Sequence, residues 1–548
     1  MLSYKFEQTR GVGCSRSPYT LRTAERGGKP SPSQPLICHA LAMNETQQDV
    51  RRLGVETTGI EIIEEAERTA QPRDLFWPWF AANVSVFGIS YAAFVLGFGI
   101  SFWQSVVVVL IGVIASFALC GIIALAGKRG SAPTMILSRA AFGVTGQKVP
   151  GVISWLTSIG WETFLTINAT LATATVMHQL GWGGGTTTKI IACIVVAALV
   201  VLASVAGYHI IMRMQSWLTW ITGIITIVFM IVAASHIDWS KVTAMPSGSW
   251  QQTIGALVMV MTGFGLGWIN IAADWSRYQR RDASGGQIVV WNTFGGAIAP
   301  VILVIFGLLL AGSDKKVASG ILANPIGALA EILPTWFLVP FLIAAILSLV
   351  SGAVLGIYSS GLTLLSLGVR IPRPTAALVD GVILTLGTIY VVFVAESFAS
   401  PFQSFLITLG VPLASWAGIM IADIALRKRS YAEEDLFDPA GRYGAWDWTS
   451  IGILVITSLI GWGLVVNNYA QDASWNNWQG YLLHPLGLGT YDAKTASWSG
   501  NWAYANLGVI AALVLSFLAA YILRRQKVAM QETGPIAEPD AAPAVTKA

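Results

Sequence analysis

Long runs of apolar residues recur along this chain and are separated by short polar segments. A window of about 20 residues, the length that crosses a hydrocarbon core of about 30 Å, predicts about twelve membrane-spanning helices. They are expected near 76–100, 103–127, 150–179, 188–209, 214–235, 253–275, 290–312, 336–367, 375–395, 402–426, 449–468 and 504–523. Only 11% of the 548 residues are charged, whereas soluble domains carry about 25%. The pattern therefore predicts an all-α polytopic membrane protein.

Lys and Arg residues follow the even-numbered spans far more often than the odd-numbered ones. The positions after even-numbered spans are Lys128, Arg129, Arg139, Lys148, Arg213, Arg277, Arg280, Arg281, Arg370, Arg373, Arg427, Lys428, Arg429, Arg442, Arg524, Arg525 and Lys527. Those after odd-numbered spans are Lys189, Lys241, Lys315, Lys316 and Lys494. Positive loops stay in the cytoplasm. We therefore expect a multi-pass plasma-membrane protein, surrounded by lipid, with both termini cytoplasmic.

The sixth span contains a glycine-rich stretch that a regular helix would not favour. Gly263, Gly265 and Gly267 alternate with bulky apolar residues, and Trp268 and Asn270 follow. Glycine is a poor helix former, and a broken helix inside a bilayer is tolerated where its backbone lines a cavity. The stretch indicates a binding site near mid-membrane. The alternative is that these glycines only allow close helix packing.

The first span also mixes polar and small residues, including Asn83 and Ser85, into an apolar run. It lies five spans before the glycine-broken one. Two interrupted helices at this spacing predict two inverted five-helix repeats plus two extra helices, with helices 1 and 6 broken. The expected parts are an N-terminal tail (1–75, of which 1–42 is disordered or follows a misassigned start), a first repeat (76–235), a second repeat (253–395, its second half extending to about 426), two last helices (449–523) and a C-terminal tail (524–548).

The third span carries an aromatic and amide stripe. Trp161, Phe164, Leu165 and Asn168 are spaced i, i+3, i+4 and i+7, so they share one helix face. An indole and an amide on one face suit a flat heterocycle, which would stack on the ring and bond at its edge. Packing aromatics with an internally satisfied Asn are the alternative.

Glu162 is the acidic residue that lies well inside a span. A charge there costs about 2.5 kcal/mol or more, so Glu162 is a candidate for the coupling proton. It could instead be a structural hydrogen-bond partner. Asp274, Asp380 and Asp423 lie near predicted cytoplasmic ends and are interpreted as topological or salt-bridged.

The eighth span is rich in small hydroxyl residues. Ser348 and Ser351 could supply oxygens to a small cation, although such residues more often bring helices close together. The sequence contains no G-x-x-x-x-G-K-S/T loop and no Cys/His cluster with metal-ligand spacing. ATP-driven pumping, a resident metal, a cofactor and nucleic-acid binding are therefore not expected.

Several motifs resemble the purine–cytosine permeases of the nucleobase–cation symporter family. They are Gly127 to Pro133 followed by Ser138 to Gly143, Phe76 to Asn83, Ser158 to Trp161, Gly267-Trp268 and Ala273-Asp274. The resemblance runs from about Gly59 to Arg429. It implies twelve helices with two inverted repeats, and proton- or sodium-coupled uptake of nucleobases or related rings.

The resemblance also implies roles for individual residues. Trp161 and Trp268 match the two aromatic binding positions, Ser85 matches the broken first helix, and the hydroxyls of the eighth span lie where sodium-coupled members bind sodium. Three departures concern the residues that would read a base. Leu165 replaces an Asn, Gly352 to Gly356 replace an Asn-rich motif, and Gln215 replaces a Glu.

The sequence thus predicts a cation-coupled symporter, with the proton favoured over sodium, for a nucleobase such as cytosine or a purine. The substrate-site candidates are Trp161, Trp268, Asn270, Ser85, Asn83, Phe164, Asn168 and Gly265, and the ion-coupling candidates are Glu162, Ser348 and Ser351. Allantoin or a hydantoin, a vitamin ring or an amino acid is the alternative cargo. A membrane enzyme or a channel is disfavoured, because no paired carboxylates are predicted within the membrane and no filter-like repeat is visible. The oligomeric state is left open.

Overall fold

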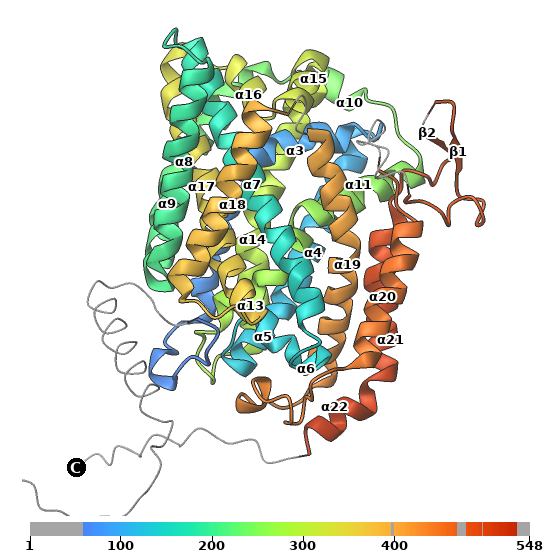
Figure 1. Ribbon diagram of the computed structural model, residues 1–548. Helices are drawn as coiled ribbons and strands as arrows, with labels where there is room; N and C mark the ends of the chain where they lie inside the picture. The colour runs from blue at the N-terminus through green and yellow to red at the C-terminus, as the bar shows by residue number, and fades with distance from the viewer. Residues whose placement is uncertain (1–58, 396–398, 468–477, 496, 534–548) are drawn as a thin grey trace, which may run out of the picture. The chain divides into compact units, whose positions relative to one another are not determined.

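The computed structural model describes residues 59–395, 399–467, 478–495 and 497–533, and α-helices dominate it (Figure 1). The predicted 1–42 tail lies outside these residues. The longer helices are α2 (Phe76–Asn83), α3 (Val86–Leu96), α4 (Phe102–Gly130), α7 (Lys148–Gln179), α8 (Thr186–Ala206), α9 (Tyr208–Ala233), α11 (Trp250–Gly263), α14 (Gly285–Ser313), α17 (Thr335–Ser366), α18 (Arg373–Phe393), α19 (Ala399–Leu426), α20 (Trp448–Gly463) and α21 (Leu507–Leu523).

Short elements connect these helices. They are η1 (Glu65–Glu67), η2 (Pro72–Leu75), α5 (Thr134–Leu137), α6 (Arg139–Phe142), η3 (Ala234–His236), α10 (Trp239–Thr243), α12 (Gly265–Trp268), η4 (Ile269–Ile271), α13 (Ala272–Ser276), α15 (Lys315–Ala323), α16 (Gly327–Glu331), η5 (Glu434–Leu436) and α22 (Arg525–Gln531). An antiparallel hairpin pairs β1 (Thr490–Asp492) with β2 (Ser497–Ser499).

The helices account for all of the predicted spans. In the described residues, eight helices are long and apolar enough to cross a membrane, and ten spans result if each of two bent helix pairs counts as one. The 32-residue α7 and the shorter apolar helix α20 occupy the two remaining predicted stretches. The arrangement is therefore compatible with twelve spans.

Local sequence signals explain where several helices begin and end. Ser101 and Ser249 begin α4 and α11 through capping boxes, in which a Gln three residues later bonds back to the backbone. Gly207 separates α8 from α9 with φ +97°, a conformation that favours glycine. These caps separate long apolar stretches into distinct spans.

Helices five spans apart pack against each other. α4 lies along α14, α7 along α17, and α8 along α18. The bent first span (α2 and α3) contacts α14, and the interrupted sixth (α11 to α13) contacts α4. A two-fold relation between two five-helix halves produces this reciprocal pattern, so the packing is consistent with the predicted inverted repeats.

Short elements outside the sixth span gather at the two ends of the helices, whereas α12, η4 and α13 continue that span. Figure 1 shows α5, α6 and α22 at one end, and α10, α15, α16 and the hairpin at the other. The first end carries the Lys- and Arg-rich connections, as the topology prediction requires, and the cytoplasmic assignment of that end stays a prediction.

A buried ion network ties the last helices together at the end with α22. Asp423, at the end of α19, accepts hydrogen bonds from Arg427 (3.0 Å) and Arg524 (2.8 Å), and Arg524 also pairs with Asp447 (3.4 Å). Asp423, Arg427 and Arg524 are almost fully buried. The interpretation of Asp423 as salt-bridged is confirmed.

We expect Arg524→Ala to destabilise the protein by about 3 kcal/mol, because removal of one partner leaves a buried carboxylate with less compensation. Thermal unfolding of the detergent-purified protein measures the change as a lower midpoint temperature. The exposed neighbour Arg525 provides a matched control, since Arg525→Ala removes the same charge outside the network. Equal midpoints for the two variants would contradict a structural role for the network.

Candidate functional site

The first span is broken at Val84 and Ser85. α2 and α3 meet there at an angle of 66°. Ser85 has an extended backbone (φ −123°, ψ 136°) and its Oγ accepts a hydrogen bond from the backbone N–H of Phe87 (3.2 Å), so it caps α3. The polar residues that the sequence places in this apolar run thus end one half-helix and begin the next.

The sixth span is interrupted at Phe264, where α11 ends and the backbone leaves the helical region (φ −114°, ψ −110°). A Cβ on Gly263 would lie 1.7 Å from the Tyr91 hydroxyl, and one on Gly265 would lie 2.2 Å from the Ser116 backbone. Both glycines are therefore needed for close packing. A Cβ on Gly267 would lie 3.5 Å from the Trp161 ring, so Gly267 keeps open the space beside that indole.

An inner cavity lies between the two breaks, α7 and α17. Its lining residues are Ala82, Asn83, Ser85, Phe87, Gly88, Ser158, Trp161, Glu162, Leu165, Gly263, Phe264, Gly267, Trp268, Asn270, Ile271, Ser348, Gly352 and Gly356. Most of the predicted site residues are among them. The structure therefore gathers side chains from four spans around one space.

Two indoles face this inner cavity from different helices. Trp161 projects from α7, and Trp268 ends α12 and packs edge-to-face on Trp79 with ring centroids 6.0 Å apart. Both are only partly buried. Gly352 lies opposite, where a Cβ would be 3.7 Å from Trp268 and 3.0 Å from Leu165. A flat ring has room against these indoles because α17 presents glycine.

The amides at the cavity offer mainly acceptors. Asn270 Nδ2 donates to the hydroxyls of Ser154 (2.8 Å) and Ser158 (3.1 Å), and Asn83 Nδ2 donates to the Trp79 carbonyl (2.8 Å). Both N–H groups of the Asn270 amide are therefore engaged within the protein, whereas Asn83 engages one of its two. Their oxygens are the atoms that can accept from a ligand N–H group.

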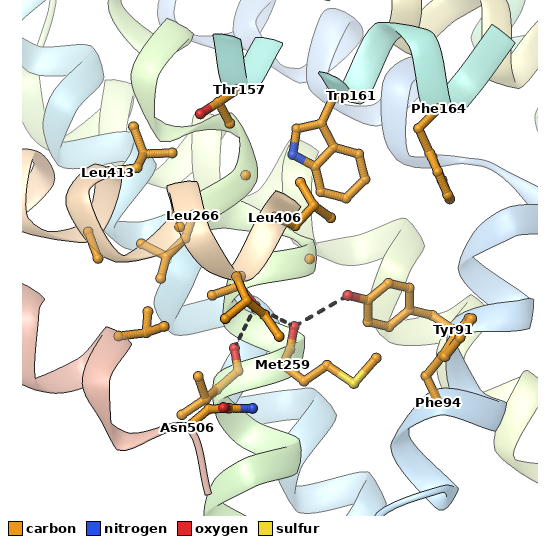
Figure 2. Close-up of a pocket in the computed structure, with 18 of the residues that line it drawn as sticks. Tyr91, Phe94, Thr157, Trp161, Phe164, Met259, Leu266, Leu406, Leu413 and Asn506 are labelled. Atoms are coloured by element: carbon orange, nitrogen blue, oxygen red, sulfur yellow. Dashed lines mark hydrogen bonds between the residues drawn. The ribbon is translucent and has the colours of Figure 1, made fainter. Parts of the chain in front are cut away.

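An outer cavity adjoins the inner one and is mostly aromatic and aliphatic (Figure 2). Trp161 lines both cavities, and Phe164, Tyr91, Phe94, Met259, Leu413 and Asn506 line the outer one. The Tyr91 hydroxyl donates to the Met259 carbonyl (3.4 Å), as the dashed line in Figure 2 marks. Trp161 and Phe164 contact edge-to-face at 5.8 Å. The outer cavity thus provides an apolar approach toward Trp161.

The hydroxyl candidates for an ion site differ in position. Ser348 lines the inner cavity, donates to the Ala345 carbonyl (3.0 Å) and bonds Ser85 Oγ (3.1 Å), which links α17 to the break in the first span. Ser351 instead donates to Gln215 on α9 (2.5 Å), and Gln215 donates back to the Ser351 carbonyl (3.0 Å). Ser348 is at the cavity, whereas Ser351 fastens α17 to α9.

Glu162 is 1% exposed and lies at the edge of the inner cavity. Within the described residues, neither of its carboxylate oxygens has a hydrogen-bond partner. A Cβ on Gly356 would lie 2.8 Å from Glu162 Oε1, so this glycine makes room for the carboxylate. A buried acid without partners is costly unless it is protonated or binds something.

Asp380 was interpreted as topological or salt-bridged, whereas the structure shows a buried carboxylate with neutral hydrogen-bond donors. Asp380 is fully buried in α18, where it accepts hydrogen bonds from Ser360 (2.6 Å) and Trp155 (3.0 Å). Ser360 also lies beside Glu162. Sequence alone does not reveal this second membrane carboxylate, because the distance of Asp380 from its helix end does not show which neighbours enclose it. Asp274 is likewise buried and accepts from Thr134.

Three predicted site residues lie outside both cavities. Asn168 donates to the Phe164 carbonyl (2.9 Å) on its own helix, Gly265 donates its N–H to Ser116 (3.1 Å), and Ser351 bonds Gln215. Their proposed roles stay predictions. Phe87 and Tyr91, which the sequence argument did not select, line the outer cavity. Their i, i+4 spacing on the second half of the broken first span is the signal that could have found them.

Comparisons with known proteins give the family and the fold of this chain. Residues 62–478 match the model of the family described as permease for cytosine/purines, uracil, thiamine, allantoin. The purine-cytosine permease FCY22 of Saccharomyces cerevisiae is 24% identical over 495 residues, which cover 85% of this chain and 88% of that protein. The purine-cytosine permease FCY2 of the same yeast is 26% identical over 278 residues, 49% of each chain.

Among solved structures, the fold is similar to Mhp1, a nucleobase-cation-symport-1 family transporter in a closed conformation with bromovinylhydantoin bound. The TM-score is 0.64 at 19% sequence identity, covering 87% of this chain and 99% of Mhp1. The inward-facing conformation of Mhp1 matches with a TM-score of 0.56. These matches show the transporter fold, and the family match covers most of the chain. This protein is therefore a multi-pass membrane transporter, not an enzyme, and it belongs to the family of permeases for cytosine and purines, uracil, thiamine and allantoin.

Proposed function

We propose that this protein takes up a nucleobase such as cytosine or a purine by alternating access, in symport with protons. The observation that carries the proposal is the inner cavity, where Trp161 and Trp268 face one space together with Asn270 and Asn83. We place this protein in the plasma membrane with both termini in the cytoplasm, an orientation that the distribution of positive loops favours.

The cavity chemistry favours a flat ring with N–H groups at its edge. Indole faces stack on such rings, at about 1–3 kcal/mol per base. Because the amide nitrogen of Asn270 donates to two serine hydroxyls, its oxygen remains as an acceptor, and Asn83 adds an oxygen acceptor and one N–H donor. The exocyclic amino group of cytosine or adenine, or a ring N–H, would complement them. On the opposite wall, Leu165 and Gly352 limit the space for a ring and offer it no side-chain hydrogen bonds.

The proton is the coupling ion that the residues favour. Glu162 places a buried carboxylate without hydrogen-bond partners, among the described residues, at the cavity edge. A carboxyl group in that position can bind one proton when the cavity faces outward and release it after the cavity closes. The hydroxyls of Ser85 and Ser348 bond each other, and a sodium ion held there would need that pair to open.

A hydantoin-like or vitamin ring is the second candidate cargo. The structural neighbour Mhp1 holds bromovinylhydantoin. A vitamin B6 transporter of Saccharomyces cerevisiae, TPN1, is 22% identical over 317 residues, which cover 55% of this chain. Both rings are flat and would use the same indoles.

Competition for uptake separates these cargoes. Labelled cytosine is supplied to cells that lack their own nucleobase permeases, with unlabelled adenine, hypoxanthine, uracil, allantoin, hydantoin and pyridoxine as competitors. We expect saturable uptake that nucleobases inhibit and the other rings do not. Inhibition by hydantoin or pyridoxine alone, or no uptake by cells carrying the protein at their surface, would overturn the nucleobase assignment.

We expect Gly352→Ala to reduce uptake of purines more than uptake of cytosine. The new methyl group would lie 3.0 Å from Leu165 and 3.7 Å from Trp268, so it narrows the slot in which the larger bicyclic ring must fit. The KM values for labelled hypoxanthine and cytosine measure the difference. Gly452→Ala in α20 is the matched control, since a Cβ there meets nothing within 4 Å. Equal changes in the KM values for hypoxanthine and cytosine would show that the substrate ring does not bind beside Gly352.

A further inference from the structure

Asp380 is a second buried carboxylate that the uptake mechanism above does not use. It is 0% exposed and receives a hydrogen bond on each oxygen, from Trp155 Nε1 (3.0 Å) and Ser360 Oγ (2.6 Å). These donors come from α7, which carries Glu162, and from α17, whose Gly356 makes room for the Glu162 carboxylate. Asp380 is therefore built into the wall behind the inner cavity.

Helix geometry places Asp380 between Glu162 and the end of the bundle that carries the positive loops. Trp155 precedes Glu162 by seven residues on α7, which corresponds to about 10 Å toward the helix start at Lys148. Ser360 lies six residues before the end of α17, and Asp380 lies seven residues after the start of α18. The predicted cytoplasmic end is thus the nearer exit for a proton on Asp380.

Ser360 connects the two carboxylates. It follows Gly356 by one helical turn on α17, so both face α7. Gly356 makes room for Glu162 Oε1, and Ser360 lies beside the Glu162 carboxylate while donating to Asp380. A serine hydroxyl can accept one proton and donate another. Its position suits a proton relay.

We propose that Ser360 and Asp380 form the inward proton path of this transporter, leading from Glu162 at the cavity to the cytoplasmic side. The proposal rests on the proton-coupled function proposed above. In the step, the protonated Glu162 carboxyl turns toward the neighbouring Ser360, donates a hydrogen bond to Ser360 Oγ and gives it its proton, and Ser360 gives its own hydroxyl proton to the Asp380 carboxylate that it already contacts. Glu162 becomes charged, Asp380 becomes neutral, and no other reactant is needed. Release from Asp380 to the cytoplasm completes the transfer.

Among the described charged groups on the helices packed against α7, no cation pairs with the carboxylates of Glu162 and Asp380. In the described part of the chain, Asp380 is the ionisable group beside Glu162. Arg373, seven residues earlier on α18, donates to the carbonyls of Ser204 and Val205. The remaining groups are Lys189 on α8, which lies near the helix start, Glu331 on α16, which is exposed, and Asp423 on α19, which pairs with Arg427 and Arg524. Among the described residues, therefore, no cation holds Glu162 or Asp380 in a fixed ion pair, and both carboxylates remain available to bind a proton.

The test compares proton-driven accumulation with exchange in liposomes that contain the purified full-length protein. Labelled cytosine and hypoxanthine are the probes, and an internal pH dye reports proton entry. Exchange of internal for external substrate needs no net proton release to the inside. We expect Asp380→Asn and Ser360→Ala to lower gradient-driven accumulation and substrate-dependent proton entry at least tenfold while exchange persists. Ser360→Thr, which retains the hydroxyl, should recover accumulation.

The outcomes separate this proposal from the function on which it rests. Wild-type protein that accumulates substrate without a proton gradient, or fails to accumulate it with one, would overturn proton coupling and the relay together. Proton-driven wild type with unchanged accumulation in Asp380→Asn would overturn the relay alone. If Asp380→Asn fails to fold, the serine pair decides: equal loss in Ser360→Ala and Ser360→Thr, or loss in neither, would contradict the relay.

Discussion

Replacement of Trp268 by alanine is expected to reduce uptake at low substrate concentration by a factor of about 5–150, while the protein remains at normal abundance in the membrane. Loss of one stacking face costs about 1–3 kcal/mol, a factor of about 5–150 in affinity. Trp268 is partly buried and packs on Trp79, so truncation opens the cavity rather than the helix core. Initial uptake rates, normalised to surface abundance, measure the effect.

Two further variants make this result specific. Trp268→Phe keeps an aromatic face and should retain part of the uptake. Trp103 is 58% exposed and lies outside both cavities, so Trp103→Ala removes an indole without touching the site. Undiminished uptake by Trp268→Ala, or an equal loss in Trp103→Ala, would remove the sixth span from the substrate site.

Glu162→Gln is expected to uncouple substrate transport from the proton gradient. Glutamine has nearly the shape of glutamate but cannot carry an exchangeable carboxyl proton. Accumulation against a concentration gradient should fall to the equilibrated level, whereas exchange of labelled for unlabelled substrate should persist. Accumulation ratios under an imposed pH gradient, together with exchange rates, measure the two properties.

The control for this variant is the exposed Glu331 on α16, where Glu331→Gln makes the same chemical change away from the cavity. It should accumulate substrate as the wild type does. If Glu162→Gln accumulates substrate to the wild-type ratio, the coupling proton is bound by another group.

The sequence predicted the spans well because each apolar run must be long enough to cross a bilayer. It also located the two interruptions, since Asn83 and Ser85 in one run and three glycines in another are poor helix interior. The sequence could not show which of these glycines are required for close packing and which keep the cavity open. Gly263 and Gly265 are fixed by contacts with Tyr91 and Ser116, which come from other spans.

Tertiary contacts also decided which candidate polar residues reach the cavity. Asn168 shares a helix face with Trp161, yet its amide bonds its own helix. In the sequence, Asp380 lies near a helix end, but in the structure Trp155 of α7 and Ser360 of α17 enclose it. Periodicity assigns a residue to a face of its helix, but the neighbour on that face comes from a distant part of the chain.

Proton-coupled uptake of a nucleobase is tested by the accumulation of labelled cytosine in liposomes that contain the wild-type protein, driven by a proton gradient in sodium-free buffer. We expect an internal concentration of cytosine above the external one, which collapses when a protonophore is added. A sodium gradient at equal pH should cause no accumulation. Accumulation from the sodium gradient alone would contradict proton coupling through Glu162.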